Sequence, residues 1–233
     1  MLIFAHRGAS AYRPQNSISA VLKALDLGAE AIEFDVQLSK DGVPIVIHDF
    51  FLNKLTTEGT GYVKDFTLNE LKNFFLIPKN GYFEEKIPTL HEFMEILPDD
   101  MLINVEIKSL LSDSMGTEDP IIDVLKKFPT KKNILISSFD HELLLRVQTK
   151  YPQYKIGALT GTNTLSMPQY FSDSPLKLES VNLSLELAEE NLIKTLHTMG
   201  YKVYVYTVND ISIALKLKKM GVDGIFSDHP DIF

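Results

Sequence analysis

The stretch Ala31-Ile32-Glu33-Phe34-Asp35-Val36 decides the predicted fold. Its β-branched and aromatic residues predict a strand, and the alternation of side chains along a strand places Glu33 and Asp35 on one face. The segment Leu102–Ile107 has the same form, with Glu106 near its end and Lys108 two residues further on. Charged side chains at the C-terminal ends of two predicted strands are typical of a (β/α) barrel, whose functional residues gather at that end.

Short strand-like segments alternate with longer amphipathic segments along the chain, which indicates βαβ units and a parallel sheet. The predicted strands are Leu2–Ala5, Ala31–Val36, Leu102–Ile107, Ile134–Ser138, Lys155–Leu159, Val181–Leu183, Lys202–Thr207 and Gly224–Phe226. The predicted helices are Ile18–Leu27, Leu90–Leu97, Pro120–Phe128, His141–Lys150, Glu186–Met199 and Ser212–Met220. Strands at this spacing predict a closed TIM-type (β/α)8 barrel, and the length of 233 residues predicts a single domain over residues 1–233.

Three segments depart from this alternation. Lys40-Asp41-Gly42 is a turn signal that returns the chain along Pro44–His48, so Phe34–His48 is predicted to form a hairpin beyond the second strand. Residues 50–88 carry only a weak helix pattern, at Leu68–Phe75, and are predicted to form a small cap inserted over one end of the barrel. We predict no regular structure for Thr162–Pro175.

The composition excludes several classes of function. The chain has no cysteine, so disulfides, thiolate metal sites and a cysteine nucleophile are ruled out. The formal charge of −8 and the lack of a basic stripe argue against a nucleic-acid partner. Neither a signal-peptide pattern nor a run of about 18 apolar residues is present, so we expect a soluble cytoplasmic protein without stable membrane association. The oligomeric state stays open.

The carboxylates of Glu33, Asp35 and Glu106 would repel one another at one end of the barrel unless a cation lay among them. An all-oxygen set of ligands suits a hard divalent ion, Mg²⁺ or Ca²⁺. For Glu33 or Glu106 taken singly, a structural ion pair at the surface is the alternative. The matching positions of all three at strand ends favour the metal site.

Two histidines and two cations accompany the carboxylates. His6 follows the first strand and His48 closes the hairpin, so both are candidates for the acid and the base of a reaction near neutral pH. Either one alone would more often be structural. Arg7 and Lys108 are placed to hold a phosphate. Lys108 could simply be a salt-bridge partner of Glu106, and the two roles are compatible.

Taken together, these motifs resemble the glycerophosphodiester phosphodiesterase family. The matching segments, in the order of the family, are His6-Arg7-Gly8-Ala9, Pro14-Gln15-Asn16-Ser17, Glu33-Phe34-Asp35-Val36-Gln37-Leu38-Ser39-Lys40-Asp41-Gly42, Pro44-Ile45-Val46-Ile47-His48-Asp49, Ile87-Pro88-Thr89-Leu90, Asn104-Val105-Glu106-Ile107-Lys108, Ser137-Ser138-Phe139 and Gly224-Ile225-Phe226-Ser227-Asp228-His229-Pro230. They span nearly the whole chain, and the resemblance implies a TIM barrel with a small inserted cap.

The resemblance also implies a set of roles. His6 and His48 would be the acid/base pair, Glu33, Asp35 and Glu106 the metal ligands, and Arg7 and Lys108 the contacts to phosphate. The implied reaction releases glycerol 3-phosphate and an alcohol from a small glycerophosphodiester. The 2-hydroxyl of glycerol would attack phosphorus and form a cyclic phosphate that water then opens. One histidine would take the proton of that hydroxyl, and the other would protonate the leaving alcohol.

Three positions depart from the pattern of the family. Gln15 stands where the family usually has glutamate, Leu55 replaces a threonine, and Tyr206 replaces a tryptophan. None of them belongs to the predicted catalytic set, so we expect activity, with the preference for the alcohol left open.

Two other functions compete with this interpretation. A phospholipase acting on a lipid phosphodiester would need an apolar insertion that faces a membrane. The phenylalanines of the insertion, which we instead expect to form its core, are Phe50, Phe51, Phe74, Phe75 and Phe83. A non-catalytic barrel that binds phosphate would be favoured by the loss of a predicted catalytic residue, and the chain has kept them all.

Overall fold

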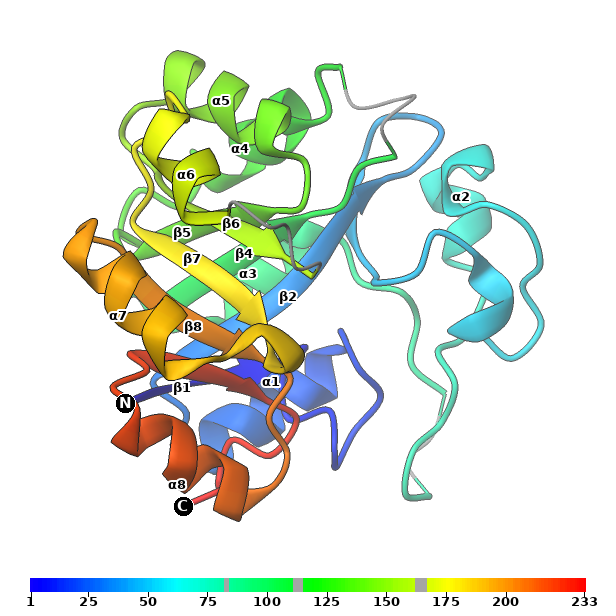
Figure 1. Ribbon diagram of the computed structural model, residues 1–233. Helices are drawn as coiled ribbons and strands as arrows, with labels where there is room; N and C mark the ends of the chain where they lie inside the picture. The colour runs from blue at the N-terminus through cyan, green and yellow to red at the C-terminus, as the bar shows by residue number, and fades with distance from the viewer. Residues whose placement is uncertain (82–83, 111–114, 162–166) are drawn as a thin grey trace.

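The computed structural model describes residues 1–81, 84–110, 115–161 and 167–233. Eight parallel strands form a closed barrel, because the first strand pairs with both the second and the last one. Helices surround the barrel, and one segment projects beside its mouth, drawn in cyan and green in Figure 1. The predicted TIM-type barrel with an insertion after the second strand is confirmed.

The barrel strands are β1 (Leu2–His6), β2 (Ala31–Leu38), β4 (Leu102–Ile107), β5 (Ile134–Ser138), β6 (Lys155–Thr160), β7 (Ser180–Ser184), β8 (Lys202–Tyr206) and β9 (Gly224–Ser227). The short strand β3 (Pro44–Val46) pairs antiparallel with the end of β2, which confirms the predicted hairpin. The helices around the barrel are α1 (Ile18–Asp26), α3 (Leu90–Ile96), α4 (Glu118–Leu125), α5 (His141–Lys150), α6 (Met167–Asp173), α7 (Glu190–Thr198) and α8 (Ile211–Lys219).

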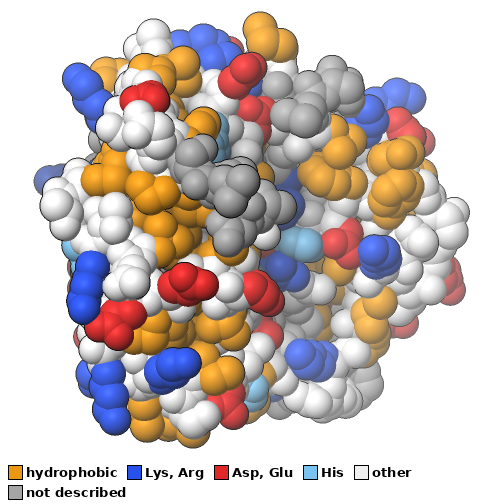
Figure 2. All heavy atoms as spheres, viewed as in Figure 1, with side chains coloured by type: hydrophobic (Ala, Val, Ile, Leu, Met, Phe, Trp, Pro, Cys, Tyr) orange, Lys and Arg blue, Asp and Glu red, His pale blue; other side chains and the backbone are white. Residues whose placement is uncertain are grey.

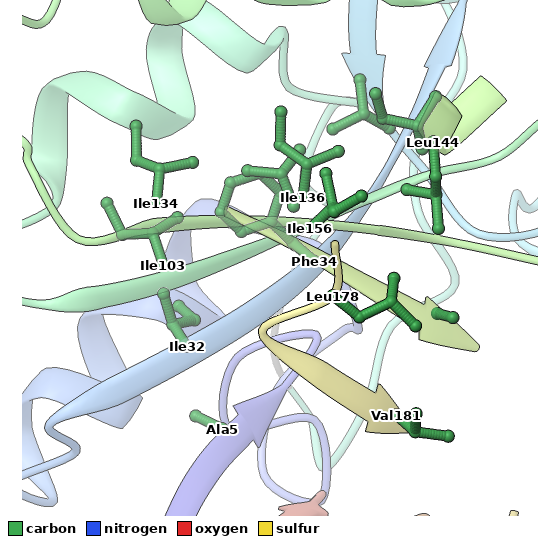
Figure 3. Packing of buried hydrophobic residues seen from close by; sticks show 14 of the residues in the cluster. Ala5, Ile32, Phe34, Ile103, Ile134, Ile136, Leu144, Ile156, Leu178 and Val181 are labelled. Atoms are coloured by element: carbon green, nitrogen blue, oxygen red, sulfur yellow. The ribbon is translucent and has the colours of Figure 1, made fainter. Parts of the chain in front are cut away.

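Alternation along each strand divides the barrel into two chemically different surfaces. The outward side chains pack against the helices in the main hydrophobic core, which includes Phe34, Ile103 and Ile136 (Figure 3). The inward side chains near the strand beginnings form a second apolar cluster, made of Phe4, Ala31, Leu135, Tyr204 and Phe226. Two residues further along β1 and β2, the inward positions carry His6 and Glu33. The apolar layer therefore closes the bottom of the barrel and leaves the polar residues at its mouth.

Two predictions of local structure were wrong. Part of Thr162–Pro175 forms the helix α6, and residues 162–166 of that stretch lie outside the described ranges. Pro168 is tolerated because it lies in the first turn of α6, where its missing N–H costs no helical hydrogen bond, and Met167 and Phe171 bury one face. The helix predicted to begin at Glu186 begins at Glu190, after a 3₁₀ turn at Leu185–Leu187.

The insertion has a small hydrophobic core of its own. Its described residues, 50–81 and 84–88, include 3₁₀ turns at Leu52–Lys54 and Val63–Asp65 and the helix α2 (Leu68–Leu71). The buried side chains of this core are Ile45, Ile47, Leu52, Leu55, Val63, Leu71, Leu76 and Ile87. Since Ile45 and Ile47 belong to the hairpin return, the insertion is packed on the element that carries His48.

The aromatic residues of the insertion only partly follow the expectation. Phe74 packs against the insertion core as predicted. Phe51 is 40% exposed and stacks on Tyr62 with ring centroids 4.1 Å apart, so the prediction of a core position was wrong for Phe51. Phe50 and Phe75 are half-buried, and Phe83 lies outside the described residues. Within the described ranges, no helix is both long enough and apolar enough to cross a membrane.

Candidate active site

Three carboxylates from two adjacent strands meet at the mouth of the barrel. Glu33 and Asp35 come from β2 and Glu106 from β4, and in the parallel register Asp35 lies opposite Glu106. One oxygen of each group lies within 4.8 Å of the others. Glu33 and Asp35 are buried, as their positions on the inward face of β2 require. The structure thus brings the three predicted ligands together.

Two oxygens of this cluster have no hydrogen-bond donor within the described residues. They are Glu33 Oε1 and Asp35 Oδ1, and both are buried. Burial is the main cause of a raised pKa of Glu33, and the charge of Asp35 is the second cause. Burial also raises the pKa of Glu106 to about 7, although the charge of Lys108 opposes this effect. Buried acceptors without a donor are costly unless another group satisfies them. The three carboxylates, their close spacing and these two oxygens without hydrogen bonds suit the binding of a hard divalent cation.

Arg7 and Lys108 both contact the carboxylates. Arg7 Nε lies 3.2 Å from Asp35 Oδ2, and the Arg7 backbone N–H donates to Glu33 Oε2 over 3.1 Å. Lys108 Nζ donates to Glu106 Oε1 over 2.8 Å and lies 3.6 Å from Asp35 Oδ1. Burial disfavours the ionised form of Asp35, but these two cations hold its pKa below its usual range. The alternative role of Lys108, as the partner of Glu106, is therefore present in the structure.

The loop after β1 aims Arg7 at the cluster. Arg7 and Gly8 both have positive φ, 57° and 79°, which turns the chain sharply after His6. A Cβ on Gly8 would lie 2.7 Å from the carbonyl carbon of Ala20, so only glycine allows the loop to approach α1 this closely. Asn16, at the end of the same loop, donates to Asp35 Oδ2 over 2.9 Å. The loop thus places the side chains of Arg7 and Asn16 against the carboxylate of Asp35.

His48 is held by the hairpin and its neighbours. Nε2 of the buried Gln37 lies 2.9 to 3.1 Å from the carbonyl oxygens of Ile47, His48 and Asp49, which share its two protons. His48 Nδ1 lies 2.7 Å from Asp49 Oδ1. A carboxylate can only accept a hydrogen bond, so Nδ1 carries the proton and Nε2 is left for the site. Burial lowers the pKa of His48, although the charge of Asp35 opposes this effect.

His6 is bound to a carboxylate from the other end of the chain. Its Nδ1 lies 2.6 Å from Asp228 Oδ1, and its Nε2 lies 3.9 Å from Glu33 Oε2. Burial lowers the pKa of His6, and the hydrogen bond to Asp228 opposes it. Burial also disfavours the ionised form of Asp228, but its hydrogen bonds from His6 and Ser10 help hold its pKa below the usual range. Both histidines therefore present Nε2 to the mouth of the barrel.

Asp49, Asp228 and Asn16 also belong to the site, although the sequence predicted no role for them. Asp49 had a local signal, because it directly follows a candidate histidine. Asp228 lies 222 residues from His6, and only the closure of the barrel between β9 and β1 brings the two together. The position of Asn16 depends on the backbone of the loop after β1, which periodicity does not reveal.

Two cavities meet at His6 and Arg7. The smaller, of about 110 Å³, is lined by residues that include Glu33, His48, Glu106 and Tyr206. The larger, of about 480 Å³, lies between the barrel and the insertion and includes Lys54, Leu55, Ile77 and Lys79. Figure 2 shows basic side chains around the hollow that separates the barrel from the insertion. His6 lines both cavities, whereas His48 lines the smaller one.

Comparison with known proteins identifies the family. The sequence model of the glycerophosphoryl diester phosphodiesterase family matches residues 6–232. The chain belongs to this family. A glycerophosphodiester phosphodiesterase from Caldanaerobacter subterraneus subsp. tengcongensis is 38% identical over 99% of this chain and 95% of the relative. Another, from Bacillus altitudinis, is 34% identical over 98% of this chain and 95% of the relative.

Solved structures agree with this assignment. A phosphodiesterase from Oleispira antarctica, in complex with the product sn-glycerol-3-phosphate, superposes with a TM-score of 0.91 at 30% identity, over 99% of this chain and 94% of that one. A glycerophosphodiester phosphodiesterase from Thermotoga maritima superposes with a TM-score of 0.81 at 29% identity, over 100% and 96%. The family places the chain among the phosphoric diester hydrolases.

The three departures from the pattern of this phosphodiesterase family lie around the two cavities. Gln15 accepts a hydrogen bond from Arg7 Nη1, so it orients the guanidinium without a charge. Leu55 belongs to the wall of the larger cavity, and Tyr206 to the wall of the smaller one. All three positions lie beside the predicted catalytic residues, and none of them replaces one.

Proposed function

We propose that this chain hydrolyses glycerophosphodiesters to glycerol 3-phosphate and an alcohol, with a divalent cation held by Glu33, Asp35 and Glu106. One observation carries the proposal: a buried carboxylate cluster lies between two histidines, each fixed by an aspartate. The product complex of the related phosphodiesterase supports glycerol 3-phosphate as one product. The chain would form one barrel domain over residues 1–233, with residues 50–88 as its cap.

The cation would be Mg²⁺ or Ca²⁺, since its ligands are all carboxylate oxygens. Bound there, it would neutralise the charge that develops on the phosphate oxygens during cleavage. Arg7 and Lys108 lie against the same cluster and would contact the phosphate, Arg7 through its planar guanidinium and Lys108 as a point charge. The positive groups offset the charge of the carboxylates, which would otherwise repel an anionic substrate.

The two cavities favour a division of roles between the histidines. The smaller cavity adjoins the carboxylates and would hold the glycerol phosphate moiety, so His48 is placed to take the proton of the 2-hydroxyl. The larger cavity would hold the alcohol, and His6 lines both cavities. The 2-hydroxyl oxygen bonds to phosphorus, the bond from phosphorus to the alcohol oxygen breaks, and His6 gives its proton to that oxygen. Water then opens the cyclic phosphate with the proton transfers reversed.

Cation binding is expected to depend on pH. Protons on Glu33 and Glu106 must leave before these groups can act as ligands, and both carboxyls have a raised pKa in the cation-free protein. The affinity for Mg²⁺ or Ca²⁺ should therefore rise as pH increases through about 7, the pKa of Glu106, with release of protons on binding. Titration calorimetry at several pH values in buffers of different ionisation enthalpy measures both effects.

The matched variants for this test lie at opposite ends of the barrel. Glu106→Gln should weaken binding of the cation by about 10-fold or more, since it removes one charged ligand. Glu179→Gln should not, because Glu179 pairs with Lys155 and Lys202 at the beginnings of the strands. Equal affinities in the wild type and Glu106→Gln would remove Glu106 from the proposed site.

The larger cavity should determine which alcohol is accepted. Lys54→Ala and Ile77→Ala change exposed side chains of its wall, so we expect altered ratios of kcat/KM among diesters with different alcohols. Stability should change by less than about 0.5 kcal/mol, as for most surface substitutions. Asn53→Ala, an exposed neighbour outside the wall, is the control. Unchanged ratios in both variants would show that the insertion plays no part in recognition of the alcohol.

A further inference from the structure

The carboxylate of Asp228 is held by three donors from two separate segments of the chain. Asp228 follows β9, and its Oδ1 is 2.6 Å from His6 Nδ1 and 2.8 Å from Ser10 Oγ. Its Oδ2 accepts from Asn209 Nδ2 over 2.7 Å. The backbone N–H of Asp228 donates to Asn209 Oδ1 over 2.9 Å. Both oxygens are therefore engaged, and the orientation of the carboxylate is fixed.

This orientation determines the state of His6. An ionised carboxylate only accepts, so Nδ1 of His6 must carry a proton, and Nε2 is the atom that faces the two cavities. When His6 is protonated, the adjacent carboxylate stabilises the imidazolium. Ser10 Oγ also lies 2.7 Å from the backbone carbonyl oxygen of His6, so these two acceptors share its single proton. These contacts leave Nε2–H of the imidazolium as the proton available to the larger cavity.

We infer that Asp228 is a positioning residue for protonation of the leaving alcohol, acting through His6 and with Ser10 and Asn209 fixing its carboxylate. The inference rests on the proposed function. Asp228 lines the larger cavity, but both its oxygens are occupied by His6, Ser10 and Asn209. Its effect on the reaction therefore passes through the imidazole. A positioning role explains why the segment after β9 forms a hydrogen bond with His6.

The test compares two leaving groups. An ordinary alcohol must gain a proton as it leaves, whereas p-nitrophenolate leaves without one. With glycerophosphocholine, Asp228→Asn should lower the rate of choline release in the first turnover by about 10²-fold or more with little change in substrate affinity, because general acid catalysis is lost. With the p-nitrophenyl diester of glycerol phosphate, the loss should be less than about 10-fold. The matched control is Asp231→Asn, since Asp231 lies on the same segment and accepts a hydrogen bond from Tyr12; it should retain activity on both substrates.

Each outcome decides between positioning and a structural role. Equal losses on both substrates, or no loss on either, would overturn the inference. If wild-type enzyme cleaves neither diester, the proposed function itself fails. If Asp228→Asn does not fold, as judged by its thermal melting curve, ¹⁵N NMR of the wild-type imidazole nitrogens tests the same claim. A protonated, hydrogen-bonded Nδ1 of His6 supports it, and a neutral ring protonated at Nε2 contradicts it.

Discussion

A glycerophosphodiester that lacks the 2-hydroxyl of its glycerol moiety is expected to bind to this enzyme without being hydrolysed. In the proposed reaction that hydroxyl is the nucleophile, and it is already tethered to the phosphate that it attacks. Tethered nucleophiles reach effective molarities of up to about 10⁵–10⁸ M, an advantage that a free water molecule lacks. His48 needs only to remove one proton from an oxygen held in the smaller cavity, beside the carboxylates.

Phosphorus NMR during turnover detects the cyclic phosphate intermediate directly. With the normal diester, a cyclic glycerol phosphate should appear transiently before glycerol 3-phosphate accumulates. The 2-deoxy analogue should act as a competitive inhibitor with a Ki close to the Kd of the substrate. Hydrolysis of the analogue at a rate near that of the normal diester would rule out the cyclic route and leave water as the nucleophile.

Removal of either histidine is expected to cost about 10²-fold or more in kcat, because each carries one of the two proton transfers. If both transfers belong to one step, the double variant should lose far less than the product of the two single losses. His6→Ala and His48→Ala are measured singly and together on glycerophosphocholine. Losses that multiply would indicate independent roles.

His91→Ala serves as the control for this comparison. His91 lies on α3, is exposed, and its Nε2 lies 3.5 Å from Glu95 on the same helix. The substitution should leave kcat unchanged. A loss comparable to that of His6→Ala would mean that removal of a histidine acts through the fold, and the acid/base assignment would then fail.

The barrel and the main cluster could be predicted from the sequence because both follow from alternation along strands. Glu33, Asp35 and Glu106 sit at inward positions near strand ends, and parallel strands bring those ends to one edge. His6 and His48 were placed by the same logic, since they directly follow strand segments. The residue types then predict a hard cation at this cluster.

The parts that escaped prediction depend on long-range closure or on loop conformation. Asp228 reaches His6 only because β9 pairs with β1. The pairing of Arg7 with Asp35 depends on a positive φ at Arg7, which a non-glycine residue rarely adopts. The helix α6 was missed because it is short and carries a proline, while the burial of Met167 and Phe171 that stabilises it is tertiary.

The proposed function requires that this barrel cleaves soluble glycerophosphodiesters with the help of a carboxylate-bound cation. The most direct measurement is the release of glycerol 3-phosphate from several glycerophosphodiesters and from liposomal phospholipid, before and after exhaustive chelation. We predict release from the soluble diesters without detergent, its loss on chelation, and its recovery when Mg²⁺ or Ca²⁺ is returned. Full activity in the chelated protein would rule out the cation, and cleavage confined to the liposomes would indicate a phospholipase.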